Sequence, residues 1–402
     1  MKKLEVFLVA CVYVAMLAVC CGAAYDDESI IAAHIEEQGR LKILDEQSKT
    51  SNALHVELGL DDVSLAYYYN ESNNGDSESA PYIIDSLSDL KLLQERVNAG
   101  IEPSGKYYRM DSDIDLSSET EWTGIGFLST THPFDGHFDG NHKTITVNNN
   151  GTIITTGLFY TIKSSGTAVK DLTVKGTVKS SSTTVNGSVT GATAAGIVYE
   201  LASGTLENCV FNGMVEAEST ASNSCGNAAG IVAYVQSAGS VKNCSFSNGT
   251  VKATGGYSTL GATAGGIVDT QYGTVSGCTT SSGSTVYAFG GTSYAGGITA
   301  FAMSGNVSIT NCTSNATISG ATYQGGILGR GTSSTVLSGN SYTGANKEVG
   351  NGSTNNNSGN NSSSNSHNGN TGSSGGGGSG CNVGLCWAGF MLGALVIMKR
   401  KI

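Results

Sequence analysis

Proline, charged residues and aromatic residues are all scarce in this 402-residue chain. It holds three prolines, 13% charged residues and 7% aromatic residues. A disordered chain normally carries more charge and more proline, and the core of a compact enzyme normally holds more aromatic rings. Proline is absent after Pro133, as continuous strand ladders require. The 56 glycines, with many Ser, Thr and Asn residues and scattered Val and Ile, indicate short strands joined by many turns.

Basic residues are also few, and histidine is missing from most of the chain. The net charge is −11, and the segment 151–343 contains six acids and seven bases. Such a segment lacks the basic field that holds phosphates, which argues against nucleic acid as a partner. No histidine lies between His142 and His367, so a nucleophilic cysteine in this part would lack a nearby histidine base.

The segment 1–24 is predicted to be a secretory signal peptide. Met1-Lys2-Lys3 precedes an apolar run from Val6 to Val19 and small residues that end at Ala24. Cleavage after Ala24 is predicted, and a lipoprotein form that carries its lipid on Cys20 is the alternative. The acidic segment that follows, 25–81, is assigned no fold.

The other end of the chain also has the composition of an envelope signal. The segment 344–380 is almost all Gly, Asn and Ser, which predicts a disordered linker. The segment 381–402 contains Cys381, an apolar run from Val383 to Met398 and a basic ending. This run is slightly short for an untilted membrane span of about 20 residues, and the basic ending would stay on the cytoplasmic side. A plain tail anchor and a processed sorting signal are both consistent with this pattern.

The glycine-rich stretch, Cys381, the short apolar run and the basic terminus resemble the Synerg-CTERM class of bacterial sorting signals. They are also similar to the related Gly-Gly and Myxo types. The resemblance implies that an envelope protease removes the tail, with Cys381 serving cleavage recognition or lipid attachment. It implies an exported protein that is anchored to the cell envelope through its C-terminus. No LPxTG-like motif is present, which disfavours a cell-wall sortase.

The body of the chain, 151–343, is an internal repeat. Four cysteines stand at nearly even intervals, and the dipeptide Gly-Ile recurs with a similar period at Gly196-Ile197, Gly230-Ile231, Gly266-Ile267, Gly297-Ile298 and Gly326-Ile327. A diverged earlier copy occupies the segment 157–178. Three short strands per copy cannot bury their apolar sides alone, but stacked copies share one continuous interior. The prediction is an all-β fold, a right-handed parallel β-helix.

The segment 190–343 resembles the GLUG-motif repeats of bacterial surface proteins. It shares the pattern of a small residue and Gly-Ile-Val, then Val-x-Asn-Cys, then Gly-x-Val. The segment 82–150 is similar to the start of such domains, with an amphipathic helix over 86–98 and the segments 122–126 and 133–141. The helix would cap the open end of the solenoid. The resemblance implies an adhesive role at the cell surface.

The repeated Asn-Cys dipeptides predict a structural ladder, because neighbouring copies of a stacked solenoid lie about 4.8 Å apart. In-register stacking points the cysteine Cβ atoms in parallel, which favours buried reduced thiols over disulfides; disulfides are the alternative. The asparagines are expected to bond one another through their amides, with breaks at Asp171 and Gly277. The ladder comprises Asn208, Cys209, Asn243, Cys244, Cys278, Asn311 and Cys312.

Two acidic groups precede the repeats. The first is an alternating set that shares one strand face: Asp111, Asp113 and Asp115. We interpret it as a solvated outer face rather than a Ca²⁺ site, because the glycine and distant glutamate of a calcium loop are missing. The second is the densest polar cluster: Asp135, His137, Asp139 and His142. Its Asp-Gly pairs indicate tight turns, with Phe134 and Phe138 filling the core.

No catalytic, cofactor or metal site is predicted. The acids of the repeats occupy different positions in the copies, namely Asp171, Glu200, Glu207, Glu216, Glu218 and Asp269. We therefore predict a non-enzymatic, adhesin-like protein, whose variable loops such as 255–263 and 288–294 present polar and aromatic groups to an extracellular glycan or protein. The alternative is a β-helix polysaccharide lyase or glycoside hydrolase, which would need two carboxylates about 5–9 Å apart in a groove.

Overall fold

The structure is a computed structural model that describes most of the chain between residues 73 and 356. The described ranges are 73–119, 122–127, 132–152, 154–182, 191–220, 224–256, 261–303, 307–343, 347–351 and 355–356. The predicted signal peptide (1–24), nearly all of the acidic leader (25–81), most of the linker and the C-terminal signal with Cys381 lie outside these residues.

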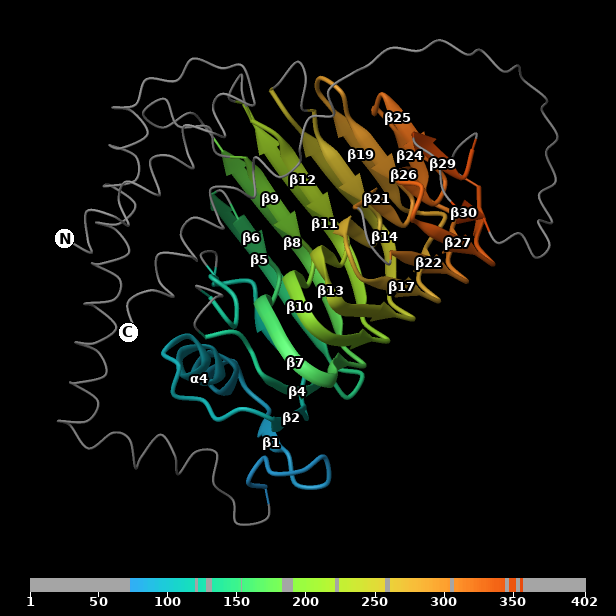
Figure 1. The fold of residues 1–402 in the computed structure, drawn as a ribbon. Helices are drawn as coiled ribbons and strands as arrows, with labels where there is room; N and C mark the ends of the chain where they lie inside the picture. Colours follow the sequence, from blue (N-terminus) through green and yellow to red (C-terminus); the bar gives the residue numbers. More distant parts are fainter. Residues whose placement is uncertain are drawn as a thin grey trace, which may run out of the picture. The chain divides into compact units, whose positions relative to one another are not determined.

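Three parallel β-sheets form the body of the protein (Figure 1), and all pairings between their strands are parallel. Sheet one has 14 strands: β1 (Tyr82–Ile84), β2 (Lys106–Met110), β4 (Gly136–Asp139), β7 (Phe159–Lys170), β10 (Val198–Glu207), β13 (Val232–Lys242), β16 (Val268–Gln271), β17 (Thr274–Ser276), β21 (Thr299–Ala302), β22 (Ser308–Thr310), β26 (Leu328–Arg330), β27 (Val336–Ser338), β29 (Val349–Asn351) and β30 (Asn355–Asn356).

Sheet two has ten strands: β3 (Ile114–Leu116), β5 (Thr144–Thr152), β8 (Thr173–Ser182), β11 (Val210–Ser219), β14 (Ser245–Thr254), β18 (Thr279–Thr280), β19 (Thr285–Phe289), β23 (Thr313–Ser314), β24 (Thr317–Ser319) and β28 (Ser341–Tyr342). Sheet three has six: β6 (Ile154–Thr156), β9 (Ala192–Ala195), β12 (Gly226–Ala229), β15 (Thr263–Gly265), β20 (Tyr294–Gly296) and β25 (Tyr323–Gly325). Each repeat of the chain passes through all three sheets, so the predicted parallel solenoid is confirmed. Its right hand stays a prediction.

The Gly-Ile dipeptides stand at the corner where each turn passes from sheet three to sheet one. Ile197 N donates to Ile231 O at 3.0 Å, and Ile231 N donates to Ile267 O at 3.0 Å. The diverged copy joins the same column, because Leu158 N donates to Ile197 O at 3.1 Å. The spacing of Gly-Ile in the sequence is therefore the length of chain in one turn.

Glycine is required at this corner because successive backbones approach one another too closely for a side chain. A Cβ atom on Gly196 would lie 2.0 Å from Gly230 O, and one on Gly230 would lie 2.1 Å from Gly266 O. Both contacts are far inside van der Waals distance and involve backbone that cannot rotate away. The repeated glycine therefore sets how tightly the turns stack.

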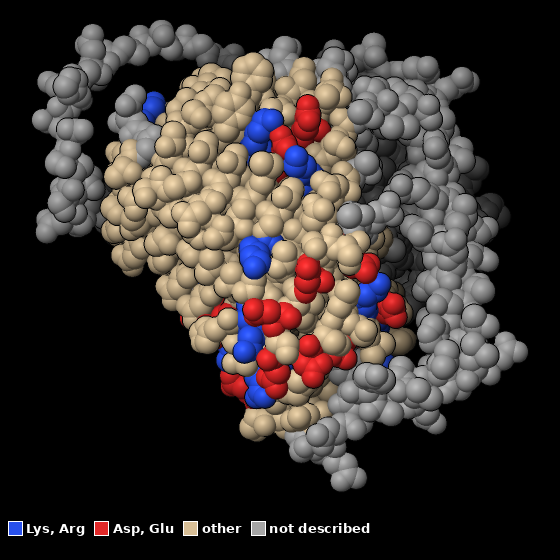
Figure 2. All heavy atoms as spheres, turned by 180° about the vertical axis from the view of Figure 1, so that it is seen from behind, with Lys and Arg blue, Asp and Glu red and all other residues tan. Residues whose placement is uncertain are grey.

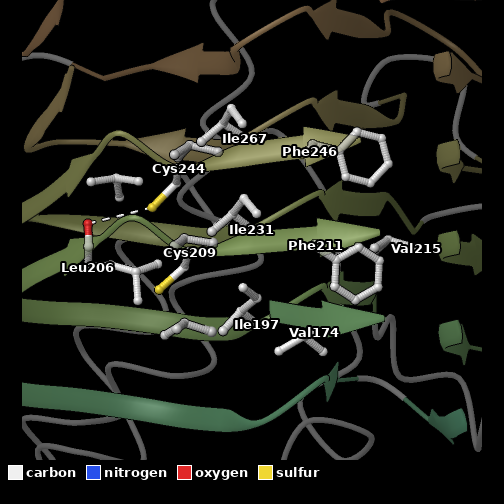
Figure 3. Packing of buried hydrophobic residues seen from close by; sticks show 14 of the residues in the cluster. Val174, Ile197, Leu206, Cys209, Phe211, Val215, Ile231, Cys244, Phe246 and Ile267 are labelled. Carbon is white, nitrogen blue, oxygen red and sulfur yellow. Dashed lines mark hydrogen bonds between the residues drawn. The ribbon is translucent and has the colours of Figure 1, made fainter. Parts of the chain in front are cut away.

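The interior of the solenoid is a single buried cluster that runs from Tyr82 to Leu337. Figure 3 shows how it is layered: isoleucines of successive turns lie in one column, cysteines in a second, and Phe211 and Phe246 in a third. The two phenyl rings are nearly parallel at 6°, with centroids 6.2 Å apart. Each turn thus covers the apolar side chains of its neighbour.

One helix, α4 (Leu87–Asn98), precedes the solenoid where the sequence predicts it. Ser86 is its N-cap and forms a capping box with Asp89. Its buried face carries Leu90, Leu93 and Val97, which belong to the same cluster as the solenoid interior. Among the described residues, no helix combines the length and apolar content needed to cross a membrane.

Candidate functional site

The four repeat cysteines form a column inside the solenoid, one in each of four successive turns. Ser245 N donates to Cys209 O at 2.8 Å, and the same bond recurs one turn on, from Thr279 N to Cys244 O at 2.9 Å. All four side chains are fully buried, and the thiol of Cys244 interacts with those of Cys209 and Cys278. Cys312 continues the column beyond Cys278.

The cysteines of this column act as small apolar side chains rather than as reactive thiols. Burial raises the pKa of Cys244 and Cys278 well above the ordinary thiol range, and the pKa of Cys312 is raised by the neighbouring Cys278 thiol and by burial. A thiol kept protonated in this way is a poor nucleophile and a poor metal ligand. Its hydrogen goes instead to a carbonyl two positions earlier, as from Cys244 Sγ to Lys242 O at 3.2 Å.

The asparagines that precede the cysteines serve a backbone turn. Asn208, Asn243 and Asn311 have φ of 53°, 52° and 54°, in the left-handed region that Asn tolerates better than most residues. The two apparent breaks in the pattern satisfy the same requirement, since Asp171 has φ of 52° and Gly277 has φ of 65°.

The expected amide ladder forms only in part among the described residues. Asn208 Nδ2 donates to Asp171 Oδ1 at 3.0 Å, but within the described part of the chain no amide bond continues from Asn243 to Asn208 or to Asn311. The break at Gly277 is the predicted one, because Gly277 offers no side chain and a Cβ there would lie 2.3 Å from Asn243 Oδ1. The bond at Asp171, where a break was predicted, and the lack of a bond between Asn208 and Asn243 differ from the prediction. Positive φ, rather than amide stacking, explains the repeated asparagine.

The acidic groups before the repeats support local structure. Asp111, Asp113 and Asp115 are exposed, with Ile114 and Leu116 buried between and after them. Each of the three carboxylates already has a partner. Asp111 pairs with Arg109 at 2.9 Å, Asp113 accepts from Thr144 N at 2.7 Å, and Asp115 accepts from Ser117 N at 2.9 Å.

The Asp135–His142 cluster is likewise divided among separate contacts. The His137 ring stacks on Tyr107 at 4.3 Å, and Asp139 accepts a hydrogen bond from Asn141 N at 2.7 Å. Phe134 and Phe138 are buried in the interior as predicted. Across the described ranges, no three metal-ligating side chains come together.

The acids of the repeats are spread over different faces. Glu200 lies on β10, where burial raises its pKa while Gln236 and Thr161 donate to it. Glu216 lies on β11; burial would raise its pKa, but ion pairs with Lys252 and Lys179, at 2.6 and 3.2 Å, leave the pKa lowered. A carboxyl held ionised in this way cannot act as the general acid of a glycosidase.

Outside the interior, side chains fill the corner between sheets three and one. Side chains on the two sides of the corner face each other there: Asn227 Nδ2 donates to Tyr234 OH at 3.3 Å, and the rings of Tyr294 and Phe301 meet edge to face at 5.8 Å. A second buried cluster follows this corner through the first repeats. Its members are Tyr160, Ala195, Tyr199, Ala233 and Tyr234, with Phe127 packed against them.

The last repeats place a cation in the same corner. The Arg330 guanidinium lies 4.8 Å from the Phe301 ring centroid and 5.4 Å from that of Tyr294, a cation–π arrangement. The Tyr323 ring stacks on Tyr294 at 5.3 Å and 14°. We call Tyr294, Phe301, Tyr323 and Arg330 the corner site.

A different pair of rings stands on the outer face of sheet two. Tyr287 and Phe289 alternate on β19 with the buried Val286 and Ala288. Their rings are stacked, with centroids 6.5 Å apart and planes inclined by only 16°. Phe289 is 58% exposed, the most of any large apolar side chain among the described residues. We call these two residues the ring pair.

The ring pair corrects one sequence prediction. The loop predicted over 288–294 spans only 290–293, because Phe289 ends β19 and Tyr294, which is 9% exposed, begins β20. The corner site is not predicted from the sequence at all. The sequence pattern that could have identified the corner site is the fourth position after the repeat glycines. The residues there pair in register through successive turns: Tyr234, Thr270, Phe301 and Arg330.

Charged side chains avoid much of the surface around these later turns. Figure 2 shows acidic and basic residues gathered over part of one face, with a broad area that carries neither. Between positions 261 and 343, Arg330 and Asp269 are the only charged residues in the sequence. Uncharged hydroxyl and amide groups therefore make up most of the polar surface there.

Comparisons with known proteins place the fold but not a family. The sequence matches no family model. A stretch of 133 residues is 37% identical to Halomucin of Haloquadratum walsbyi (strain DSM 16790 / HBSQ001), covering 32% of this chain and 1% of Halomucin. The chain thus spans about one hundredth of the length of that curated relative.

A solved structure from Bacteroides ovatus, provisionally named an immunoglobulin A1 protease, has the same fold. It superposes with a TM-score of 0.53 at 20% sequence identity, over 70% of this chain and 84% of that chain. At this identity the likeness shows the fold alone, a parallel β-solenoid.

Proposed function

We propose that this protein is an exported, envelope-anchored β-solenoid that binds an extracellular glycan through the ring pair. The observation that supports binding most directly is the exposure of Phe289 beside Tyr287 on a flat sheet face. Large apolar surfaces are rarely left exposed without a partner. The dispersed acids and the protonated thiols of the described residues favour this adhesin-like role over a carbohydrate-active enzyme.

The geometry of the ring pair suits a sugar. The Phe289 ring is largely exposed and nearly parallel to the Tyr287 ring, and pyranose rings carry a face of C–H groups that packs on an exposed aromatic ring. A Cβ atom at Gly320 would lie 2.4 Å from the Tyr287 ring, so this ring rests against the next turn and is held in place. Lys252 stands beside Tyr287 in the strand register and can donate hydrogen bonds to sugar hydroxyls.

Phe289→Ala is expected to weaken glycan binding by about tenfold, because the more exposed of the two rings is lost. The measurement is a glycan array with the full chain, followed by titration of the best ligand. Val336→Ala is the matched control, since Val336 is also exposed, at 37%, but lies on β27 of sheet one. Equal binding by Phe289→Ala and the parent protein, or no glycan bound at all, would rule out the ring pair as the site.

The envelope location is tested separately, by mass spectrometry of the mature chain ends after cell fractionation. The signal-peptide proposal predicts a mature chain that begins at Tyr25, because small residues precede the polar segment. The sorting proposal predicts that the segment 383–402 is absent from the surface form. If peptides from 383–402 remain attached to surface protein, the C-terminus is a plain tail anchor and is not processed.

A further inference from the structure

Arg330 forms no ion pair with a described residue, although Lys347 and Glu348 lie in the next turn, where their carbonyls accept from Gly326 N and Leu328 N. It is the only cation between positions 261 and 343, and the only acid there is Asp269. Asp269 is fully buried on β16, two strands away from β26 in sheet one. None of the salt bridges within the described ranges includes Arg330. Its positive charge is therefore not neutralised by an ion pair with any described residue.

The guanidinium is nevertheless held in a fixed position. It lies over the rings of Phe301 and Tyr294 and donates one hydrogen bond, from NH1 to Tyr294 OH at 3.4 Å. A guanidinium has five N–H donors, so most of them have no protein acceptor among the described residues. The side chain is half-buried, which leaves these donors within reach of a ligand. A planar, oriented guanidinium of this kind binds carboxylate or sulfate oxygens in pairs.

A stacking surface lies across the corner from this cation. Tyr323 pairs in register with Tyr294, and Arg330 pairs in register with Phe301. Tyr323 and Arg330 therefore occupy the two sides of the corner that Tyr294 and Phe301 occupy one turn earlier. One face of the Tyr323 ring covers Tyr294, and no other described ring stacks on its second face. Strand β25, which carries Tyr323, is the last strand of sheet three. The aromatic stack thus ends at a half-buried ring beside an unneutralised cation.

We propose that the corner site binds an acidic sugar, a uronate or a sulfated pyranose, with its ring on Tyr323 and its anionic group on Arg330. This site is distinct from the ring pair on sheet two and does not depend on it. A single cation suits one anionic group per sugar. A nucleic acid would need several phosphate contacts to bind, and between positions 261 and 351 the sequence provides only one further cation, Lys347.

The test compares two probes that share their sugar rings, one with charged carboxylates and one with neutral methyl esters. Calorimetric titration of the full chain with trigalacturonate and with its fully methyl-esterified form measures the contribution of the carboxylates. We expect the acid to bind about 10- to 100-fold more tightly than the ester, because a hydrogen bond to a charged group is lost in the ester. Arg330→Gln should remove this difference, and Phe289→Ala should leave it unchanged.

Two further variants keep the result interpretable. Lys242→Gln removes one exposed cation from β13 and matches the change in net charge; it should bind the acid as the parent does. Arg330→Lys retains the charge without the planar guanidinium, and its affinity for the acid should fall between those of the parent and Arg330→Gln. If circular dichroism shows that Arg330→Gln does not fold, the affinity of Arg330→Lys tests the proposal instead.

Four results would overturn the proposal. The first is equal binding of acid and ester, and the second is undiminished binding of the acid by Arg330→Gln or by Arg330→Lys. The third is binding of sodium sulfate as tight as that of the trisaccharide. The fourth is tighter binding of an oligothymidylate of equal charge than of the trisaccharide. Sulfate binding alone would mean a simple anion site. Unchanged glycan binding by Phe289→Ala, together with an intact acid–ester difference, would count against the ring pair only.

Discussion

Replacing Gly230 with alanine is expected to destabilise the solenoid by about 3 kcal/mol or more, at the upper end of overpacking effects. The new methyl group would lie 2.1 Å from Gly266 O and 2.8 Å from Phe246 Cδ2. The carbonyl cannot move aside, because the corner is tied to the next turn by a 3.0 Å bond from Gly230 N to Gly265 O. Domains of ordinary size are stable by only about 5–15 kcal/mol, so the loss should be readily measured.

The measurement is guanidinium unfolding of the full chain, followed by circular dichroism. Gly166→Ala is the control, because a Cβ at Gly166 meets nothing within 4 Å. Gly166 has φ of 66°. Its replacement should therefore cost only the strain of a left-handed alanine, about 1–2 kcal/mol. If Gly230→Ala is no less stable than Gly166→Ala, close stacking at the Gly-Ile corner does not hold the turns together.

Raising the pH above about 9 under reducing conditions should destabilise the protein steeply. The pKa of Cys244, Cys278 and Cys312 is raised above the ordinary value of 9.0 in the folded chain. Above that pH the unfolded chain loses these protons while the folded chain keeps them, so unfolding is favoured. Three thiols together should remove about 4 kcal/mol per pH unit, since each contributes about 1.4 kcal/mol.

A single substitution isolates the effect of the thiols. Cys278→Ala should reduce the slope of unfolding free energy against pH by at least a third, about 1.4 kcal/mol per unit or more, because it removes one thiol and also the largest cause of the raised pKa of Cys312. The pKa of Tyr272 and Tyr342 is also raised by burial; these groups act in the same direction above their ordinary pKa and are unchanged in the variant. Parallel pH curves for the parent and the variant would show that the column does not keep its protons.

The sequence predicts the scaffold well because the scaffold is repetitive. The Gly-Ile steps identify the corner, the Cys steps identify an interior column, and the spacing of Leu90, Leu93 and Val97 identifies α4. Each of these positions requires one type of residue. Glycine is required where no Cβ atom fits, and an apolar side chain is required where a neighbouring turn covers it. The repeated asparagine was explained by amide bonds between turns, but Asn243 forms no such bond with Asn208 or Asn311 among the described residues. Its positive φ explains its place in the turn.

The surface is predicted poorly because it depends on the angle between sheets. Tyr323 and Arg330 lie on different sheets of one repeat, and Tyr294 belongs to the preceding turn. Their meeting requires both the corner after each repeat glycine and the stacking of turns in register. The bounds of the loop predicted over 288–294 were too wide by residues at both ends, because a strand as short as the three residues of β20 carries little periodicity of its own.

Composition and spacing alone determined that this chain stacks its turns, that glycine marks each corner and that cysteine fills the interior. These positions can be predicted because the same steric fit is required in every turn of the solenoid. Only the tertiary structure decided which polar and aromatic side chains meet on the outside. Contacts such as that of Arg330 with Phe301 join different turns across a bend, and no pattern within one repeat contains that information.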